Sequence, residues 1–236
     1  MASSPTALVL GAGIMGLTAA WALARRGFSV RIVEQDEVPN PRGASVDHHR
    51  LIRHAYGAQA GYMRMVDPAY AAWDMVWRDL GEVLHIPTGV LAVSGSTRGW
   101  LGESRTALAA DGHAFETLAA AGVAARFPIF TEAGIGAAFH MKPGGVLLAD
   151  RIVAGLARHL AGRGVVIERA RAAEVDPDRA RLRLADGGLH AGDLRGRYPP
   201  GGHRAVAVRL CGQRRPPRHP PPPPQPPHPP PPPPHP

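Results

Sequence analysis

The 236 residues allow one large domain or two small ones, and the single Cys excludes a disulfide framework and a Cys-based zinc site. The formal net charge of +8 arises near the C-terminus, because residues 195–236 carry seven Arg and no acidic residue, whereas the first 194 residues hold 20 basic and 19 acidic side chains. The charge is therefore poor evidence for a nucleic-acid partner, and none is predicted.

The apolar runs of the chain are short. A secretory signal peptide is not expected, since the N-terminus lacks a basic segment and glycines interrupt its apolar run. No apolar stretch approaches the roughly 20 residues that a membrane span needs. We therefore predict a soluble, cytoplasmic protein with no membrane partner. We also expect a monomer that acts on a small-molecule substrate.

The first third of the chain has the pattern of a β-α-β unit. Residues 6–10 (TALVL) form an apolar run of strand length that ends at a glycine cluster. Residues 14–26 follow with apolar side chains at helical spacing, and Gly27 is predicted to end this helix. A second apolar run at residues 30–33 ends at Glu34. A helix between two strands in this way predicts a parallel pair.

The remaining elements are less regular, and residues 35–61 are predicted to be rich in loops. Trp73 and Trp77, spaced i, i+4, are predicted to lie in the core. Asp150 is predicted to cap the helix that follows it. We expect further helices at residues 62–84, 99–111 and 151–162, and further strands at residues 89–94, 134–140, 165–168 and 181–184.

Residues 11–16 (GAGIMG) match the pattern G-x-G-x-x-G, and they lie between the first predicted strand and the first predicted helix. Gly11 permits the tight turn from strand to helix, and Gly13 lets the backbone approach a pyrophosphate. Gly16 lets the helix and the strand pack closely. The pattern in this setting predicts a dinucleotide site.

The rest of the predicted dinucleotide site lies at the start of the helix and the end of the second strand. The pyrophosphate would lie at the helix N-terminus, with Ile14 and Met15 in its first turn. Glu34 follows Gly16 by 18 residues, where a carboxylate can accept both ribose hydroxyls and would repel a 2′-phosphate. These residues leave the choice between NAD and FAD open.

Residues 43–57 (GASVDHHRLIRHAYG) carry the block R-x-x-R-H-x-Y-G. This segment resembles the flavin-contacting stretch of the D-amino-acid-oxidase-like flavoproteins, and it is most similar to the branch of monomeric sarcosine oxidase and N-methyltryptophan oxidase. The resemblance continues through TGVL at residues 88–91, RFP at residues 126–128 and GGVLL at residues 144–148. It covers about residues 6–188.

The resemblance implies an α/β fold in which a Rossmann-like FAD-binding domain is interleaved with an incomplete, mixed-sheet substrate domain. Residues 1–85 and 142–188 would form the first domain, and residues 86–141 the second. The implied reaction is oxidation of the C–N bond of an amino acid or N-methylated amine. The substrate would pass a hydride equivalent to FAD, water would hydrolyse the resulting imine, and oxygen would reoxidise the flavin to give peroxide.

The resemblance also implies roles for particular residues. The position of Arg53 holds the substrate carboxylate, and that of Arg50 lies beside the flavin. A guanidinium suits both places, because its fork binds a carboxylate and its charge favours the anionic reduced flavin. The remaining predicted cofactor-binding residues are Gln35, Arg42, Ser45 and Ala172.

Two features depart from the family pattern. Val46 stands where the sarcosine oxidase pattern has a His near the flavin. After Gly188 the chain is rich in Arg, Pro, Gly and His, and 16 of its 26 Pro lie between Pro216 and Pro236. We expect residues 189–236 to be a disordered, frameshifted or misannotated tail. We also expect weak or absent turnover, and poor folding because the sheet would keep an open edge.

Three other interpretations remain. The first is an NAD(P)-dependent or other oxidoreductase that uses the same fingerprint. The second is a non-catalytic relic whose polyproline tail binds SH3-like grooves. The third takes the basic residues between His48 and His54 as a solvated face. No metal site is predicted, because two His so close together do not suffice for one.

Overall fold

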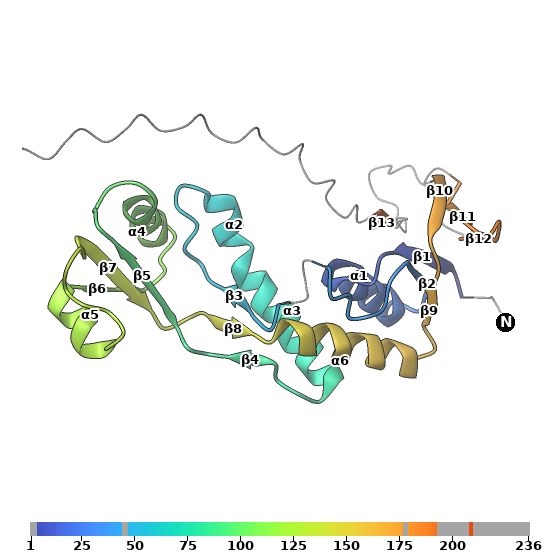
Figure 1. Ribbon diagram of the computed structural model, residues 1–236, viewed down its shortest axis with the longest axis horizontal. Helices are drawn as coiled ribbons and strands as arrows, with labels where there is room; N and C mark the ends of the chain where they lie inside the picture. The colour runs from blue at the N-terminus through green and yellow to red at the C-terminus, as the bar shows by residue number, and fades with distance from the viewer. Residues whose placement is uncertain (1–3, 44–46, 177–178, 193–207, 210–236) are drawn as a thin grey trace, which may run out of the picture.

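The computed structural model describes residues 4–43, 47–176, 179–192 and 208–209 and has a mixed α/β fold, as predicted (Figure 1). Among the described residues, the helices are α1 (Ile14–Arg25), α2 (Ala60–Arg64), α3 (Val66–Leu80), α4 (Trp100–Ala110), α5 (Ala120–Arg126) and α6 (Ala149–Gly162). The strands are β1 (Thr6–Leu10), β2 (Ser29–Glu34), β3 (Arg50–Ile52), β4 (His85–Ile86), β5 (Val90–Ser94), β6 (Glu116–Leu118), β7 (Ala137–Met141), β8 (Gly145–Leu147), β9 (Val166–Arg169), β10 (Ala172–Asp176), β11 (Arg181–Leu184), β12 (Leu189–Ala191) and β13 (Val208–Arg209). None of the helices in these ranges is long and apolar enough to span a membrane.

A parallel sheet with the strand order β13-β1-β2-β9 contains the predicted β-α-β unit. β1 pairs with β2 along its whole length, with Leu10 opposite Val33, and α1 makes the crossover between them. β2 pairs with β9 on its other side, with Glu34 opposite Arg169. The carboxyl ends of β1 and β2 therefore meet at one edge of the sheet, where the glycine turn begins.

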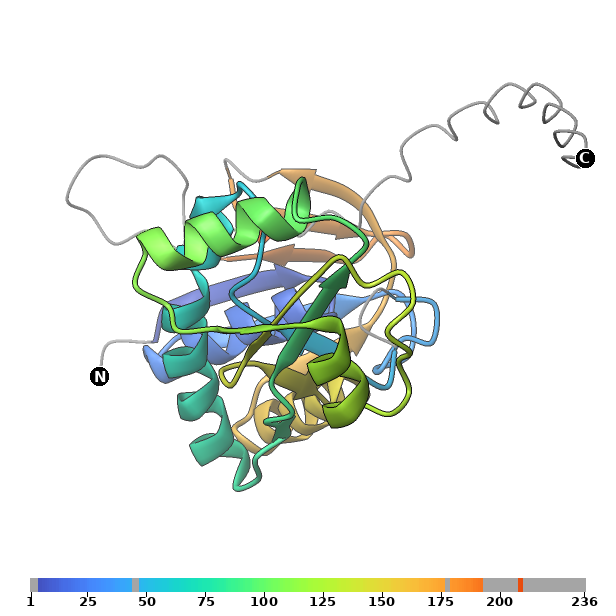
Figure 2. The ribbon, with the colours of Figure 1, turned by 90° about the vertical axis from the view of Figure 1, so that its left-hand side faces the viewer.

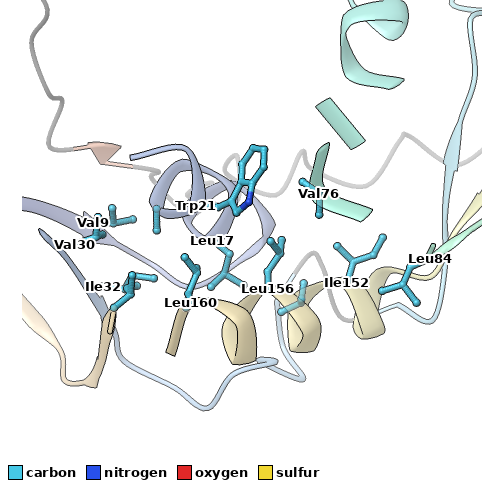
Figure 3. Packing of buried hydrophobic residues seen from close by; sticks show 14 of the residues in the cluster. Val9, Leu17, Trp21, Val30, Ile32, Val76, Leu84, Ile152, Leu156 and Leu160 are labelled. Atoms are coloured by element: carbon cyan, nitrogen blue, oxygen red, sulfur yellow. The ribbon is translucent and has the colours of Figure 1, made fainter. Parts of the chain in front are cut away.

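The largest hydrophobic cluster packs α1, α3 and α6 against the parallel sheet (Figure 3). Leu17 of α1 and Leu156 and Leu160 of α6 are fully buried. The i, i+4 spacing of the two α6 residues puts both on the helix face toward α1. Trp73 and Trp77 stack with 5.0 Å between ring centroids; Trp77 is buried in this cluster, and Trp73 is partly buried and packs against it. The predicted core position is confirmed for Trp77, whereas Trp73 lies at the margin of the core.

The helix predicted over residues 62–84 is divided into α2 and α3, which meet at Met65. Pro68 gives a physical reason, because it has no N–H to donate to the carbonyl of Arg64 and so interrupts the helical hydrogen bonds. α3 ends at Leu80, and its C-cap residue is Gly81, whose φ of 70° is in the left-handed region and whose N–H donates to the carbonyl of Trp77.

A second, antiparallel sheet has the order β5-β7-β6, and it lies at the other end of the molecule from the parallel sheet (Figure 1). Figure 2 views the molecule from this end, with α4 toward the top and α5 toward the bottom. Phe139 of β7 and Leu101 and Leu108 of α4 are among the buried residues of its hydrophobic cluster. The predicted strand at residues 134–140 begins later, at Ala137.

Several short elements were not predicted. β3 lies within the segment predicted to be loops, and it pairs with β8, from Ile52 opposite Gly145 to Arg50 opposite Leu147. β4 pairs with the other edge of β8. β10 joins β11 and β12 in an antiparallel sheet, where only β11 was predicted. Strands of two to five residues have no periodicity long enough to identify, so their partners decide them.

The structure corrects the predicted start of the C-terminal tail. Within residues 189–236, β12 pairs with β11, and Val208–Arg209 pairs in parallel with β1 opposite Val9 and Leu10. β1 therefore has a partner at these two positions, and β13 is the outermost strand of the sheet there. The rest of the predicted tail, Cys211 included, lies outside the described residues.

Candidate functional site

The turn from β1 to α1 has the backbone geometry that its glycines predict. Gly11 has φ +99° and donates its N–H to the carbonyl of Val33, with 2.8 Å between nitrogen and oxygen. A Cβ at Gly16 would lie 1.9 Å from the carbonyl oxygen of Gly11 and 3.5 Å from a methyl of Val9. Only glycine fits there, so Gly16 allows the helix to approach the turn and β1 closely.

The N-terminus of α1 suits an anionic group. Gly13 is the N-cap residue, and no described side chain makes the capping hydrogen bond. The first turn contains no acidic residue, and the side chain of Met15 is 62 % exposed. The positive end of the helix dipole is thus accessible, and no acidic residue of the first turn of α1 neutralises it.

Glu34, at the end of β2, is fixed against this turn. One carboxylate oxygen accepts the N–H of Ala12 at 2.7 Å, and the other accepts the N–H of Asp36 at 3.0 Å. An ionised carboxylate has about four acceptor positions, so about two remain for a ligand. The two halves of the predicted dinucleotide site therefore lie in direct contact.

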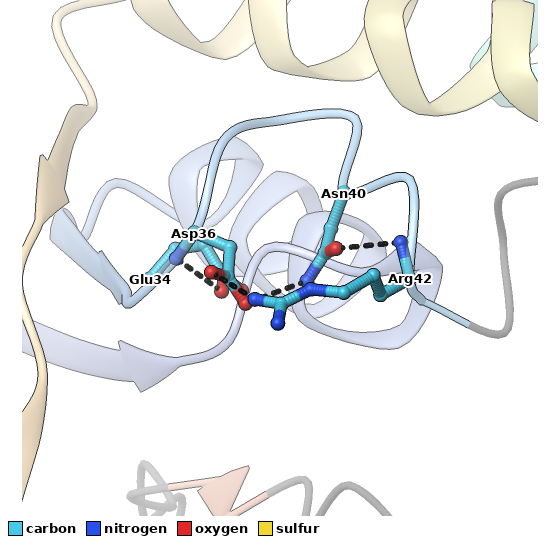
Figure 4. A network of polar contacts seen from close by, with 4 residues as sticks. All are labelled: Glu34, Asp36, Asn40 and Arg42. Carbon is cyan, nitrogen blue, oxygen red and sulfur yellow. Dashed lines mark hydrogen bonds and ion pairs between the residues drawn. The ribbon is translucent and has the colours of Figure 1, made fainter.

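The loop after Glu34 holds a polar network that the sequence did not predict (Figure 4). Asp36 binds the guanidinium of Arg42 at 2.6 Å and accepts from the side-chain amide of Asn40 at 3.1 Å. Asn40 in turn accepts the backbone N–H of Arg42 at 2.8 Å. Arg42 is thereby held beside the strand end, whereas Gln35 is exposed.

Of the last two predicted cofactor-binding residues, Ser45 lies outside the described residues, as does Val46. Ala172 begins β10 and packs against the small cluster that contains Leu182 and Leu184. The backbone N–H of Ala170 donates to the carbonyl of Glu34 at 2.9 Å, so the β9–β10 connection reaches the end of β2.

The two arginines predicted to serve the reaction, Arg53 for the substrate carboxylate and Arg50 beside the flavin, have different surroundings. Arg50 is exposed at the start of β3, and its guanidinium bonds to the carboxylate of Asp47. Arg53 is half-buried in the turn after β3, and it donates to the carbonyl of Ala55. Its guanidinium carbon also lies over an aromatic ring of α4, that of Trp100, at 5.3 Å from the centroid. Sequence spacing gave no sign of this contact.

The basic residues between His48 and His54 do not form a uniform solvated face, because His54 is only 2 % exposed. Its Nε2 lies 2.8 Å from a carboxylate oxygen of Asp67, and its ring centroid lies 4.4 Å from that of His113. The ligand atoms of these three side chains lie within 4.8 Å of one another. The sequence did not group them, and the hydrogen bond to Asp67 accounts for the buried Nε2.

Asp150 does not cap α6 as predicted. The helix begins one residue earlier, at Ala149, and its N-cap residue is Leu148. The Asp150 carboxylate instead lies 3.1 Å from Nδ1 of His48 and accepts the backbone N–H of Arg151. These hydrogen bonds, that of His48 first, lower the pKa of the Asp150 carboxyl.

Two of the segments that carry the family resemblance meet at a buried histidine. Arg126 donates to Nδ1 of His140 at 3.2 Å and pairs with Glu116 at 2.7 Å. A Cβ at Gly89 would lie 2.8 Å from Nε2 of the same ring. Burial, followed by the charge of Arg126, lowers the pKa of His140.

Comparison with known proteins finds one matching family model and relatives that are oxidases. The family model described as FAD dependent oxidoreductase (DAO) matches residues 6–197. The chain is 33% identical over 175 residues to peroxisomal sarcosine oxidase of Mus musculus, covering 72% of this chain and 44% of that protein. It is 27% identical over 124 residues to N-methyl-L-tryptophan oxidase of Yersinia pestis (strain Pestoides F), covering 52% of this chain and 33% of that protein.

The fold resembles that of a solved oxidase structure. Glycine oxidase from Geobacillus kaustophilus superposes with a TM-score of 0.68 at 16% identity, covering 81% of this chain and 55% of that chain. The chain therefore spans about half the length of this structure, and 44% or less of the two curated relatives above.

Proposed function

Because the chain belongs to the DAO family of FAD dependent oxidoreductases, we propose that it binds FAD and serves in oxidation of the C–N bond of an amino acid or N-methyl amino acid, with oxygen as acceptor. The names of the matched relatives support this substrate class, since they are oxidases of sarcosine, N-methyl-L-tryptophan and glycine. FAD, when bound, supplies the acceptor for the two electrons that the C–N bond loses.

The contact between Glu34 and Ala12 is the observation that carries the cofactor proposal. It holds a carboxylate with spare acceptor positions next to a helix N-terminus that has no side-chain cap. A dinucleotide needs both features at this spacing, one for a ribose and one for the pyrophosphate. The proposed cofactor-binding residues are Gly11, Gly13, Ile14, Met15, Gly16, Glu34, Gln35, Arg42, Ser45 and Ala172.

Arg53 is the proposed site for the substrate carboxylate. One of its N–H groups donates to the carbonyl of Ala55, and a guanidinium has five N–H donors, so most remain for a carboxylate. Arg50 is proposed to lie beside the flavin ring, where its fixed positive charge would stabilise negative charge on a reduced ring. Both roles rest on the family resemblance together with the accessible charge.

The hydrophobic clusters support the proposed division into a cofactor domain (residues 1–85 and 142–188) and a substrate domain (residues 86–141). The buried residues around α1 and α6 all come from the first set of ranges. Those around β7 come mainly from the second, with Ala55 and Met63 added from the first. A monomeric state and a cytoplasmic location stay predictions.

The proposal is tested on the purified full chain by its absorbance spectrum and by quantifying FAD released on heating. We expect the purified protein to contain nearly one FAD per chain. If it is purified without FAD, we expect it to bind added FAD tightly, as measured by calorimetry. Glu34→Gln should weaken this binding, whereas Glu82→Gln, at a carboxylate that follows the C-cap of α3, should not. Colourless protein that takes up no added FAD would refute the proposal, and binding of NAD in its place would favour the other oxidoreductase class.

A further inference from the structure

α4 is docked unusually closely on the turn that follows β3. The hydroxyl oxygen of Ser104 accepts the backbone N–H of Gly57 at 2.8 Å, and Ser104 is fully buried. Gly57 has φ +61°, and a Cβ added to it would lie 2.8 Å from Cδ1 of Trp100. The contact therefore requires glycine at position 57, and it places the first turn of α4 directly beside Arg53.

This docking brings a second aromatic ring to the guanidinium of Arg53, which lies over the rings of Tyr56 and Trp100. Its central carbon lies 4.6 Å from the ring centroid of Tyr56 and 5.3 Å from that of Trp100. The ring of Tyr56 lies a further 5.7 Å from that of Tyr62. The four side chains form one continuous series, Trp100, Arg53, Tyr56 and Tyr62, which we call the aromatic–arginine row.

The ends of the aromatic–arginine row are open to solvent, since Trp100 is 46 % and Tyr62 is 59 % exposed. Large aromatic faces beside a fixed guanidinium present apolar surface and positive charge together. Contacts with two rings also restrict the rotamers of Arg53, which lowers the entropic cost of binding a carboxylate. A small substrate such as an N-methylated glycine would cover little of this surface.

We propose that the aromatic–arginine row is a subsite for amino acids with an aromatic or other large apolar side chain. Arg53 binds the carboxylate and Trp100 contacts the side chain, so Trp100 determines specificity. Ser104 is a positioning residue, because it holds α4, and hence Trp100, against Arg53 through Gly57. This inference rests on the proposed function, in which Arg53 is the site of the substrate carboxylate.

Calorimetric titration of the full chain, with and without saturating FAD, tests the subsite with three probes: indole-3-acetate, acetate and the uncharged indole-3-acetamide. We expect indole-3-acetate to bind about tenfold more tightly than acetate, the size of one favourable aromatic contact, and indole-3-acetamide to bind weakly. Arg53→Met should abolish binding of both carboxylates.

Variants separate the roles of the row. Trp100→Leu should remove the preference for indole-3-acetate and leave acetate binding unchanged, whereas Trp100→Phe should retain most of the preference. Ser104→Ala should weaken the binding of indole-3-acetate more than that of acetate, and it should lower the melting temperature because the buried N–H of Gly57 loses its acceptor. Phe130→Leu, at an exposed aromatic outside the row, is the matched control and should change nothing.

Equal affinities for the two carboxylates, or an unchanged preference in Trp100→Leu, would overturn the inference. Bound FAD with no carboxylate binding would also overturn it, and would leave the cofactor proposal standing. Failure to bind FAD would count against the proposed function, whereas the carboxylate titrations without FAD would still decide on the row.

Discussion

Replacing Gly16 by Ala tests the glycine turn with a change of one carbon atom. The added Cβ would lie 1.9 Å from the carbonyl oxygen of Gly11 and 2.9 Å from its carbonyl carbon. Both neighbours are backbone atoms, so no side chain can rotate to relieve the contact. The turn, or the start of α1, therefore has to move by about 1 Å before the new atom fits.

The change in the free energy of unfolding that Gly16→Ala causes is the difference between two opposing effects. Overpacking of this kind costs about 1–3 kcal/mol, and Ala gains about 1 kcal/mol over Gly in helix propensity. We expect Gly16→Ala to lower the free energy of unfolding by about 1–2 kcal/mol. It should also weaken FAD binding by about tenfold, because the displaced turn no longer holds Ala12 and Glu34 in place.

Urea unfolding followed by circular dichroism measures the stability, and calorimetric titration measures FAD binding. Gly61→Ala is the matched control, because Gly61 lies near the start of α2 and an added Cβ meets no atom within 4 Å. It should be neutral or stabilising, by up to about 1 kcal/mol. A Gly16→Ala protein with wild-type stability and wild-type FAD affinity would refute the argument from the turn.

Three further changes test other parts of the structure. Glu34→Gln places an amide against the N–H of Ala12 or Asp36 and should cost about 1–3 kcal/mol of unfolding free energy as well as FAD affinity, so an unchanged urea midpoint would contradict it. His140 has a pKa below its ordinary value of 6.5 in the folded chain, so the unfolded chain takes up more protons and stability should fall as pH decreases through and below 6.5. His140→Leu should flatten this dependence in urea titrations between pH 8 and pH 5 (roughly the window in which a histidine titrates), and an equally steep profile would count against it. Leu156→Ala, at a fully buried residue, should lower the free energy of unfolding by about 3 kcal/mol. Leu189→Ala, at an exposed residue, should lower it by less than about 0.5 kcal/mol in the same urea assay.

The β1–α1–β2 unit was predictable because its determinants are local. Apolar periodicity over residues 6–33 specifies the two strands and the helix between them, and the fingerprint glycines specify the turn. The side chain of Glu34 could also be placed, because it ends a strand whose neighbour leads into that turn. Its hydrogen bond to Ala12 follows from the parallel pairing of the two strands.

Short strands and loop networks could not be predicted in this way. β3 exists because its three residues pair with β8, which lies far along the chain. Asp36 and Asn40 hold Arg42, yet isolated polar residues in a loop show no periodicity that identifies their partners. The break at Met65 and the end of α3 at Gly81 were visible as a Pro and a Gly, but the longer apolar stripe concealed them.

The sequence alone therefore determined the α/β class, the glycine turn and its acidic partner, since backbone sterics and apolar periodicity act over a few residues. Only the tertiary structure decided the surroundings of Arg53 and His54. α4 brings Trp100 and Ser104 to the turn that contains Arg53. The buried ring of His54 contacts the carboxylate of Asp67 and the ring of His113. These contacts join residues that are distant in the chain, and they exist only after the helices have packed on the sheets.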